Sequence, residues 1–195
     1  MPRTPLLLLS IFSSFFPAVQ AAAQLSPLQV EVNAGVWLPS ADLSGVMDVE
    51  GPASGDASFG VHFALTRGRI IYLLGFTENR FACREGACAT EASFVSTGWD
   101  LGFRVSLRES GLIPWFRLTG NAGVAQTRLG GPGAVMIESD RGWGFEVGAG
   151  FLVPLATRFA LSPGIRYGRT DMDFPSQGNL ETRHMIVGLA FILGF

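Results

Sequence analysis

The stretch TRHMIVGLAFILGF, residues 182–195, decides the fold class of this chain. From Met185 to Phe195 every second position carries a large apolar side chain, and the positions between them include Gly188 and Ala190. Alternation with a period of two predicts a β-strand with one apolar face. The stretch is long for a strand of a soluble domain, whereas a tilted strand needs roughly 9–11 residues to cross a membrane. It therefore predicts a membrane-spanning strand.

The first residues have the composition of an export signal. Arg3 gives a short positive start, an apolar run extends from Leu6 to Val19, and Ala21 to Ala23 offer the small side chains that a signal peptidase needs. We predict that residues 1–23 are a cleaved secretory signal. A transmembrane helix is the alternative, but the run is shorter than the roughly 20 apolar residues that such a helix requires.

The composition of the full chain favours a β architecture. Loss of the single charge of Arg3 takes the formal net charge from −2 to −3, so nucleic acid is not expected as a partner. The 25 glycines and 16 phenylalanines, with only 15% charged residues, argue against a disordered chain and against a mostly helical one. Since no later segment has the length and apolarity of a spanning helix, a chain that enters a membrane must do so as a closed sheet.

Alternation and turn residues predict eight strands. They cover residues 28–38, 57–66, 69–81, 93–108, 112–127, 142–154, 158–170 and 182–195. Short and long connections alternate along the chain. The short ones are expected at 66–69, 108–111 and 154–157, and the long ones, rich in Gly, Pro, Ser and Asp, at 39–56, 82–92, 128–141 and 171–181. This pattern is typical of a membrane barrel with brief turns on one side and extended loops on the other.

The two faces of these strands differ in polarity. One is apolar from Val30 on the first strand to Phe195 on the last. An eight-stranded barrel encloses little more than its own side chains, so the more than thirty bulky apolar groups of this face cannot all point inward. If they faced water, their exposed apolar surface would be larger than the patches that soluble monomers tolerate. We predict an all-β fold, an eight-stranded antiparallel up-and-down transmembrane β-barrel. Its lumen is expected to hold a polar network of Glu31, Asn33, His62, Asp100, Arg104, Arg117, Asn121, Glu146, Arg166 and His184.

Pairing across the short turns predicts which charges meet. Glu146 is expected to face Arg166, and Arg117 to lie diagonal to Asp100. The inward face carries three acids and three arginines. Equal numbers of positive and negative side chains favour a network of ion pairs that fills the lumen, rather than a pore lined by charges of one sign.

Cys83 and Cys88 are the only cysteines and lie in one predicted outer loop. In an exported protein such a pair most simply forms a disulfide. A metal site would need further ligands, and no histidine or third cysteine is nearby in the sequence. We expect neither a metal nor a cofactor.

His62 and His184 are the only histidines, and both belong to the inward face. An enzyme would combine one of them with an acid such as Glu31 and with a serine, for which the candidates are Ser58, Ser96 and Ser106. The sequence has no compact motif of that kind, no phosphate-binding loop and no dinucleotide fingerprint. We expect both histidines to be hydrogen-bonded within the network, and no catalytic residue.

The terminal strand also carries a family resemblance. Its outward positions, which we predict to be an assembly signal, are Val187, Leu189, Phe191, Leu193 and Phe195. In this pattern the chain resembles the small OmpA/OmpX-like eight-stranded barrels of bacterial outer membranes, over residues 24–195. The resemblance implies a single barrel domain in the outer membrane, with both termini on the periplasmic side. It also implies outer-membrane lipids as surroundings, and periplasmic chaperones and the barrel-assembly machinery as partners during biogenesis, with Phe195 as the key contact.

These observations predict an integral outer-membrane protein, expected to be a monomer. Its role would be structural or one of surface interaction, with four long extracellular loops contacting an unknown partner. Two alternatives stay open: a narrow channel or uptake port for small apolar solutes, and an outer-membrane lipid-modifying enzyme. The fold alone does not choose among them.

Overall fold

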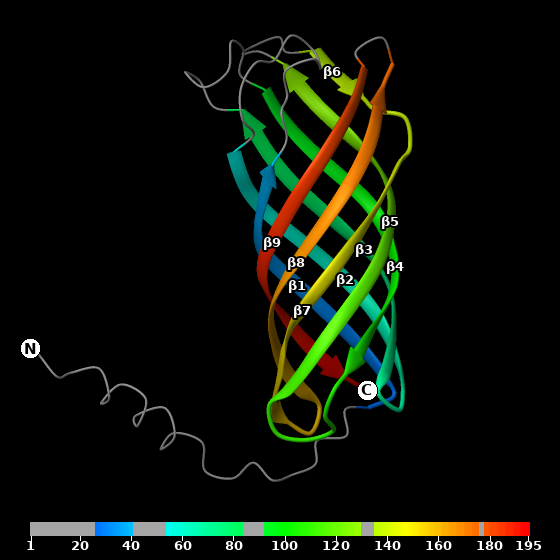
Figure 1. Cartoon of the computed structure of the whole chain (residues 1–195), viewed down its shortest axis with the longest axis vertical. Coiled ribbons are helices and arrows are strands. Elements are labelled where there is room, and N and C mark those ends of the chain that lie inside the picture. Colours follow the sequence, from blue (N-terminus) through cyan, green and yellow to red (C-terminus); the bar gives the residue numbers. More distant parts are fainter. Residues whose placement is uncertain (1–25, 41–53, 84–91, 130–134, 176–177) are drawn as a thin grey trace, which may run out of the picture.

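In the computed structural model, which describes residues 26–40, 54–83, 92–129, 135–175 and 178–195, the chain forms a closed antiparallel β-barrel (Figure 1). Neighbours in sequence pair around the ring, and β9 pairs with β1 to close it. The strands are β1 (Leu28–Ser40), β2 (Ser54–Arg67), β3 (Ile70–Cys83), β4 (Ala92–Ser106), β5 (Ile113–Leu129), β6 (Val135–Glu138), β7 (Gly142–Ala156), β8 (Phe159–Phe174) and β9 (Gly178–Gly194). Within the described residues, no helix has the length and apolarity needed to cross a membrane.

The short strand β6 and the strand β7 share one position beside β5. Glu138 of β6 pairs with Gln126, whereas Gly142 of β7 pairs with Gly123, so the register changes by one residue between them. Ser139 lies in this break: its backbone N–H donates to the carbonyl of Ala125, and its hydroxyl accepts from the Ala125 N–H, both at 2.8 Å. A bulge therefore joins β6 and β7 into one spanning unit, and the predicted eight-stranded antiparallel barrel is confirmed.

The two ends of the barrel differ in their connections. At the turn end, which also carries the start of β1 and the end of β9, the links span residues 68–69, 107–112 and 157–158 (Figure 1). Gly68 adopts a φ of 62°, a left-handed conformation that glycine reaches without strain. At the loop end the strands are joined by residues 41–53, 84–91, 130–134 and 175–177.

The prediction of four long loops is wrong for the last two. Strand β5 continues to Leu129 and β6 begins at Val135, so only residues 130–134 separate these two paired strands within the expected loop 128–141. Likewise β8 continues to Phe174 and β9 begins at Gly178, so most of the expected loop 171–181 is strand. The first segment contains Gly130 to Gly133 and the second is polar, so both resemble loops in the sequence, yet their backbones complete the β5–β6 and β8–β9 ladders.

The predicted register across two turns is also wrong. Glu146 lies opposite Gly168, while Arg166 lies opposite Gly148. Arg117 lies directly opposite Arg104 and not diagonal to Asp100. Both true registers differ from the predicted ones by two residues. The cause is local: an irregularity at Pro154–Ala156 moves the β7–β8 turn, and the β4–β5 link has six residues, 107–112, instead of a tight turn.

Candidate functional site

The outer surface of the barrel is apolar. On β9 the side chains of Met185, Val187, Leu189 and Phe191 are each about two-fifths exposed, between 39% and 47%, and Phe195 follows at the turn end with 64%. The other strands continue this surface with Phe59, Val61, Phe63, Tyr72, Leu74, Phe76, Trp99, Leu101, Phe116, Leu118, Trp143, Phe145, Val147, Ile165 and Tyr167. A continuous apolar girdle of this kind is stable against acyl chains and not against water.

Above this girdle, at the loop end, the outward side chains become charged. Arg169 of β8 forms ion pairs with Asp171 at 3.3 Å and with Glu181 of β9 at 3.1 Å, and Arg183 contacts the same Glu181 at 3.0 Å. The strands therefore continue past the apolar girdle into a region whose side chains suit water.

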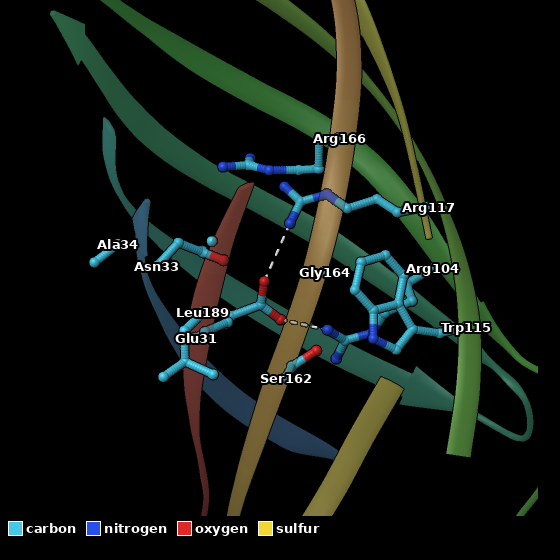
Figure 2. Close-up of a pocket in the computed structure, with 12 residues that line it drawn as sticks. Glu31, Asn33, Ala34, Arg104, Trp115, Arg117, Ser162, Gly164, Arg166 and Leu189 are labelled. Atoms are coloured by element: carbon cyan, nitrogen blue, oxygen red, sulfur yellow. Dashed lines mark hydrogen bonds and ion pairs between the residues drawn. The ribbon is translucent and has the colours of Figure 1, made fainter. Parts of the chain in front are cut away.

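Inside the barrel, Glu31 of β1 is the centre of a buried ion cluster. Its Oε2 accepts a hydrogen bond from Arg104 Nη1 of β4 at 2.6 Å, and its Oε1 accepts one from Arg117 Nη1 of β5 at 3.1 Å (Figure 2). The three side chains are between 1% and 5% exposed. Arg104 also lies over the ring of Trp115, with 5.9 Å from its Cζ to the ring centroid. The Glu31 carboxylate thus accepts hydrogen bonds from two guanidinium groups, whose residues lie opposite each other on β4 and β5.

His62 and Asp100 meet across a glycine. Both are cross-strand neighbours of Gly75 on β3, one from β2 and one from β4, and His62 Nε2 lies 2.9 Å from Asp100 Oδ2. A Cβ atom on Gly75 would overlap the imidazole ring and the Val61 carbonyl. His62 also lies 2.9 Å from Arg117 Nη2, which links this pair to the Glu31 cluster. The remaining partners of the pair are Asn33, whose Nδ2 lies 2.9 Å from His62 Nδ1, and Thr77, whose hydroxyl donates to Asp100.

The second histidine repeats this arrangement on the other side of the barrel. Glu146 of β7 and His184 of β9 are the two cross-strand neighbours of Gly168 on β8, and Glu146 Oε1 lies 3.0 Å from His184 Nε2. Arg166 Nη1 donates to the other carboxylate oxygen of Glu146 at 3.2 Å. The predicted contact between Glu146 and Arg166 is therefore present, although as a diagonal pair, because long side chains reach diagonal neighbours.

Gly75→Ala is expected to lower the free energy of unfolding by about 1–3 kcal/mol, because the added methyl group has no space beneath His62. Urea unfolding in detergent measures the change. Gly120→Ala is the matched control: a Cβ there would have only the Leu101 and Gly144 carbonyls near it, at 3.8 and 4.0 Å, so this variant should gain about 0.4–1 kcal/mol. Equal effects at the two positions would contradict the packing described here.

An aromatic layer closes the lumen on the loop side of the charged groups. The ring centroids of Trp37 and Phe81 lie 4.6 Å apart, and Phe81 stacks on Phe94 at 4.5 Å with nearly parallel planes. Trp37 also contacts the imidazole of His184, with 5.1 Å between centroids. The same layer is completed by Met172, Phe174 and Leu180, all buried. Sequence reasoning missed this layer, although counting in steps of two from Glu31 reaches Trp37, and from Asp100 reaches Phe94.

An apolar layer closes the lumen on the turn side. It consists of the buried residues Ile113, Trp115, Leu152, Ala160 and Ile192, with Ala64, Ile71 and Leu73 as a second group. A hollow of about 390 Å³ lies at the turn end and has Ile71, Ile113 and Leu152 in its wall. The charged cluster is therefore held between two apolar layers.

Two small cavities lie between these layers. One, of about 20 Å³, is lined by Glu31, Arg104, Trp115, Arg117, Ser162 and Arg166 among others. The other, also of about 20 Å³, is lined by Thr77, Asn79, Asp100, Asn121, Glu146 and Thr170 among others. A cavity of this size accommodates one or two water molecules and is too small for a channel.

The structure brings the ten sequence-predicted lumen residues to the inward face. Nine are buried, and Asn121 is half-buried opposite Asp100. Thr77, Thr119 and Trp115 also join the cluster, and they were not predicted from the sequence. The five terminal-strand residues from Val187 to Phe195 lie along β9 and its end.

Cys83 ends β3, whereas Cys88 lies outside the described residues, so the disulfide stays a prediction.

The apolar girdle, the closed ring and the buried polar lumen together define the fold of a small eight-stranded outer-membrane β-barrel. Solved structures agree with this assignment and confirm the predicted resemblance at the level of the fold. The Neisserial surface protein A (NspA) has a TM-score of 0.61 and 15% sequence identity, covering 87% of this chain and 98% of that chain.

Two other solved barrels are similar to this chain. OprG from Pseudomonas aeruginosa has a TM-score of 0.56 and 10% identity, covering 89% of this chain and 99% of that chain. Ail, the attachment invasion locus protein of Yersinia pestis, solved with the heparin analogue sucrose octasulfate, has a TM-score of 0.53 and 11% identity, covering 85% and 99%. No protein-family model matches the sequence, and no curated protein matches it.

Proposed function

We propose that this protein is a sealed integral outer-membrane barrel whose role, structural or in surface interaction, is carried by its loop end. The single observation that supports a sealed barrel best is the buried ion cluster around Glu31, held between the Trp37 aromatic layer and the Trp115 apolar layer. Moving a hydrated ion through this stack would require breaking charge pairs that are buried in the barrel interior.

The loop end is the part of the barrel that suits contact with a partner. The strand ends extend beyond the apolar girdle, where they carry a charged collar formed by Arg169, Asp171, Glu181 and Arg183. NspA is a surface protein and Ail an attachment invasion locus protein, and both similarities support a non-enzymatic role at the cell surface. Crosslinking from collar positions in intact cells, compared with positions on the turn end such as Arg108, tests this role. Partners captured equally from both ends would contradict it.

The sealed lumen predicts the electrical behaviour of the protein. In planar bilayers the inserted protein is expected to give little conductance, because the two cavities in the described lumen hold about 20 Å³ each. Insertion is checked separately by the heat-modifiable gel migration of the folded barrel. A steady large-pore current from correctly inserted protein would rule out the sealed barrel.

The two alternative functions lack a supporting observation in the described residues. A channel for apolar solutes would need a path through both apolar layers and the charged cluster between them. An enzyme would need an accessible nucleophile beside a histidine, but His62 is fully buried and contacts Asn33, Asp100 and Arg117. The hydroxyl of Ser58, one of the candidate nucleophiles, donates instead to Asn79 at 2.6 Å.

We also propose that the barrel-assembly machinery reads the terminal strand, with Phe195 as its main contact. The Phe195 side chain is 64% exposed, while its backbone N–H donates to the Leu28 carbonyl at 3.0 Å. Deleting Phe195 is therefore expected to reduce the amount of folded barrel in cells severalfold while leaving refolding in detergent nearly unchanged. Leu28→Ala is the matched control, since this side chain is similarly exposed at the same end. If deletion of Phe195 reduced the amount of folded barrel equally in cells and in detergent, Phe195 would contribute only to the stability of the barrel and not to its assembly.

A further inference from the structure

The two small cavities in the lumen differ in charge. The cavity beside Glu31 is lined by three arginines, Arg104, Arg117 and Arg166, and by a single carboxylate. The other cavity is lined by two carboxylates, Asp100 and Glu146, and by no arginine. The buried charges of the barrel are thus balanced overall, but separated into a basic cavity and an acidic one.

The basic cavity is surrounded by hydrogen-bond donors that have no protein partner. Arg104 Nη2, Trp115 Nε1 and Ser162 Oγ are buried and unpaired among the described residues, and all three side chains line this cavity (Figure 2). Their exposed fractions are 2%, 5% and 3%. They come from β4, β5 and β8, so three separate strands place a free donor around one space. Buried polar groups in native proteins are nearly always paired, which points to an occupant.

The charge around the basic cavity is not balanced locally. Glu31 is shared by Arg104 and Arg117, and Arg166 is paired with Glu146 at 3.2 Å. Three guanidinium groups therefore face two carboxylates. Asp100, the remaining buried acid of the cluster, contacts His62 and Thr77 and lines the other cavity. The lining of the basic cavity thus carries more positive than negative groups, and a negative occupant would stabilise the folded barrel.

We propose that the basic cavity binds one halide ion, chloride under physiological conditions, held by Arg104 Nη2, Trp115 Nε1 and Ser162 Oγ. The volume of about 20 Å³ suits a single monoatomic ion and is too small for a phosphate or sulfate. A water molecule satisfies this site less well, because its oxygen accepts from at most two of the three donors, whereas a halide accepts from all three. The site is independent of what the loop end binds.

Crystallography with bromide locates the ion directly. The protein is unfolded in urea, refolded in detergent with sodium bromide so that the ion can enter, and crystallised. An anomalous bromine peak within hydrogen-bond distance of Arg104 Nη2, Trp115 Nε1 and Ser162 Oγ is expected. A cavity that contains only water, with no anomalous signal, would overturn the proposal.

Stability measurements test the same site in solution. Urea unfolding is compared in sodium bromide and in sodium gluconate, whose anion is too large for the cavity. Bromide at about ten times its Kd should raise the folding equilibrium constant about elevenfold, because an ion that binds only the folded state adds to its stability. The same constant in both salts would contradict the proposal.

Variants separate this binding from general salt effects. Ser162→Ala removes one donor with little change of shape, and Trp115→Phe removes another while keeping an aromatic ring, so the bromide effect should fall severalfold in both. Thr182→Val is the matched control: Thr182 Oγ1 is also buried without a partner in the described structure, but it does not line this cavity. A bromide effect that persists in Ser162→Ala, or that is equally lost in Thr182→Val, would place the ion elsewhere.

Discussion

Replacing Glu31 with alanine is expected to lower the free energy of unfolding by about 3–5 kcal/mol, among the largest effects of any single change in this barrel. The substitution leaves Arg104 and Arg117, which lie 2.6 and 3.1 Å from the Glu31 carboxylate, without the anion that they share. Both guanidinium groups are enclosed between two apolar layers, and the small cavity beside them cannot hold the hydration shell that would replace the lost carboxylate. Urea unfolding in detergent micelles measures the loss.

Glu109→Ala is the control for this result. Glu109 pairs with Arg69 at 3.1 Å, a distance similar to those in the Glu31 cluster, but both side chains are more than half exposed at the turn end. Exposed pairs contribute about 0–1 kcal/mol, so this variant should be close to wild type. If the two variants lost equal stability, the lumen would be hydrated enough to screen its charges, and the sealed interior would be wrong.

Leu189→Arg is expected to cost about 2–4 kcal/mol, because it places a cation against acyl chains near the bilayer midplane. Leu189 lies midway along the outward apolar run of β9, which extends from Met185 to Phe195, and its side chain is 47% exposed. Reversible folding into lipid vesicles, followed by urea titration, measures this cost.

The matched control is on the same strand and the same face. Asn179 points outward from β9 at the loop end, beyond the apolar girdle and next to the charged collar. Asn179→Arg should therefore cost only about 0–1 kcal/mol. A neutral effect at Leu189, or an equal cost at both positions, would show that the outward face does not contact the membrane interior.

The facing of the strands could be predicted from the sequence, but their register could not. Apolar and polar residues alternate with a period of two, which decides which side chains point outward. A shift of the strand register by two residues keeps every side chain on its face, so the alternation of polarity cannot reveal such a shift. Both register errors, at Glu146 against Arg166 and at Arg117 against Asp100, are shifts of two. The turns set the register, and their geometry depends on the link 107–112 and on the irregularity at Pro154.

Parts of the candidate site follow from composition and others from contacts that no local pattern reveals. The charged residues of the lumen stand out because acids and arginines are rare on a membrane strand. Gly75 and Gly168 do not stand out among 25 glycines, yet each makes room for an acid and a histidine from the two flanking strands. The length of the last outer loop was overestimated because Asp171, Asp173 and Glu181 have loop-like polarity while their backbones complete the β8–β9 ladder.

Fluorescence quenching by brominated lipids tests the central claim most directly, because the four tryptophans divide evenly between the two faces. Trp99 and Trp143 point outward with 65% and 67% exposure, whereas Trp37 and Trp115 point inward with 2% and 5%. In single-tryptophan variants folded into vesicles with brominated acyl chains, strong quenching is expected for Trp99 and Trp143, and little for Trp37 and Trp115. Strong quenching of Trp37 and Trp115, with Trp99 and Trp143 left unquenched, would contradict the account by showing that the charged face meets the lipid.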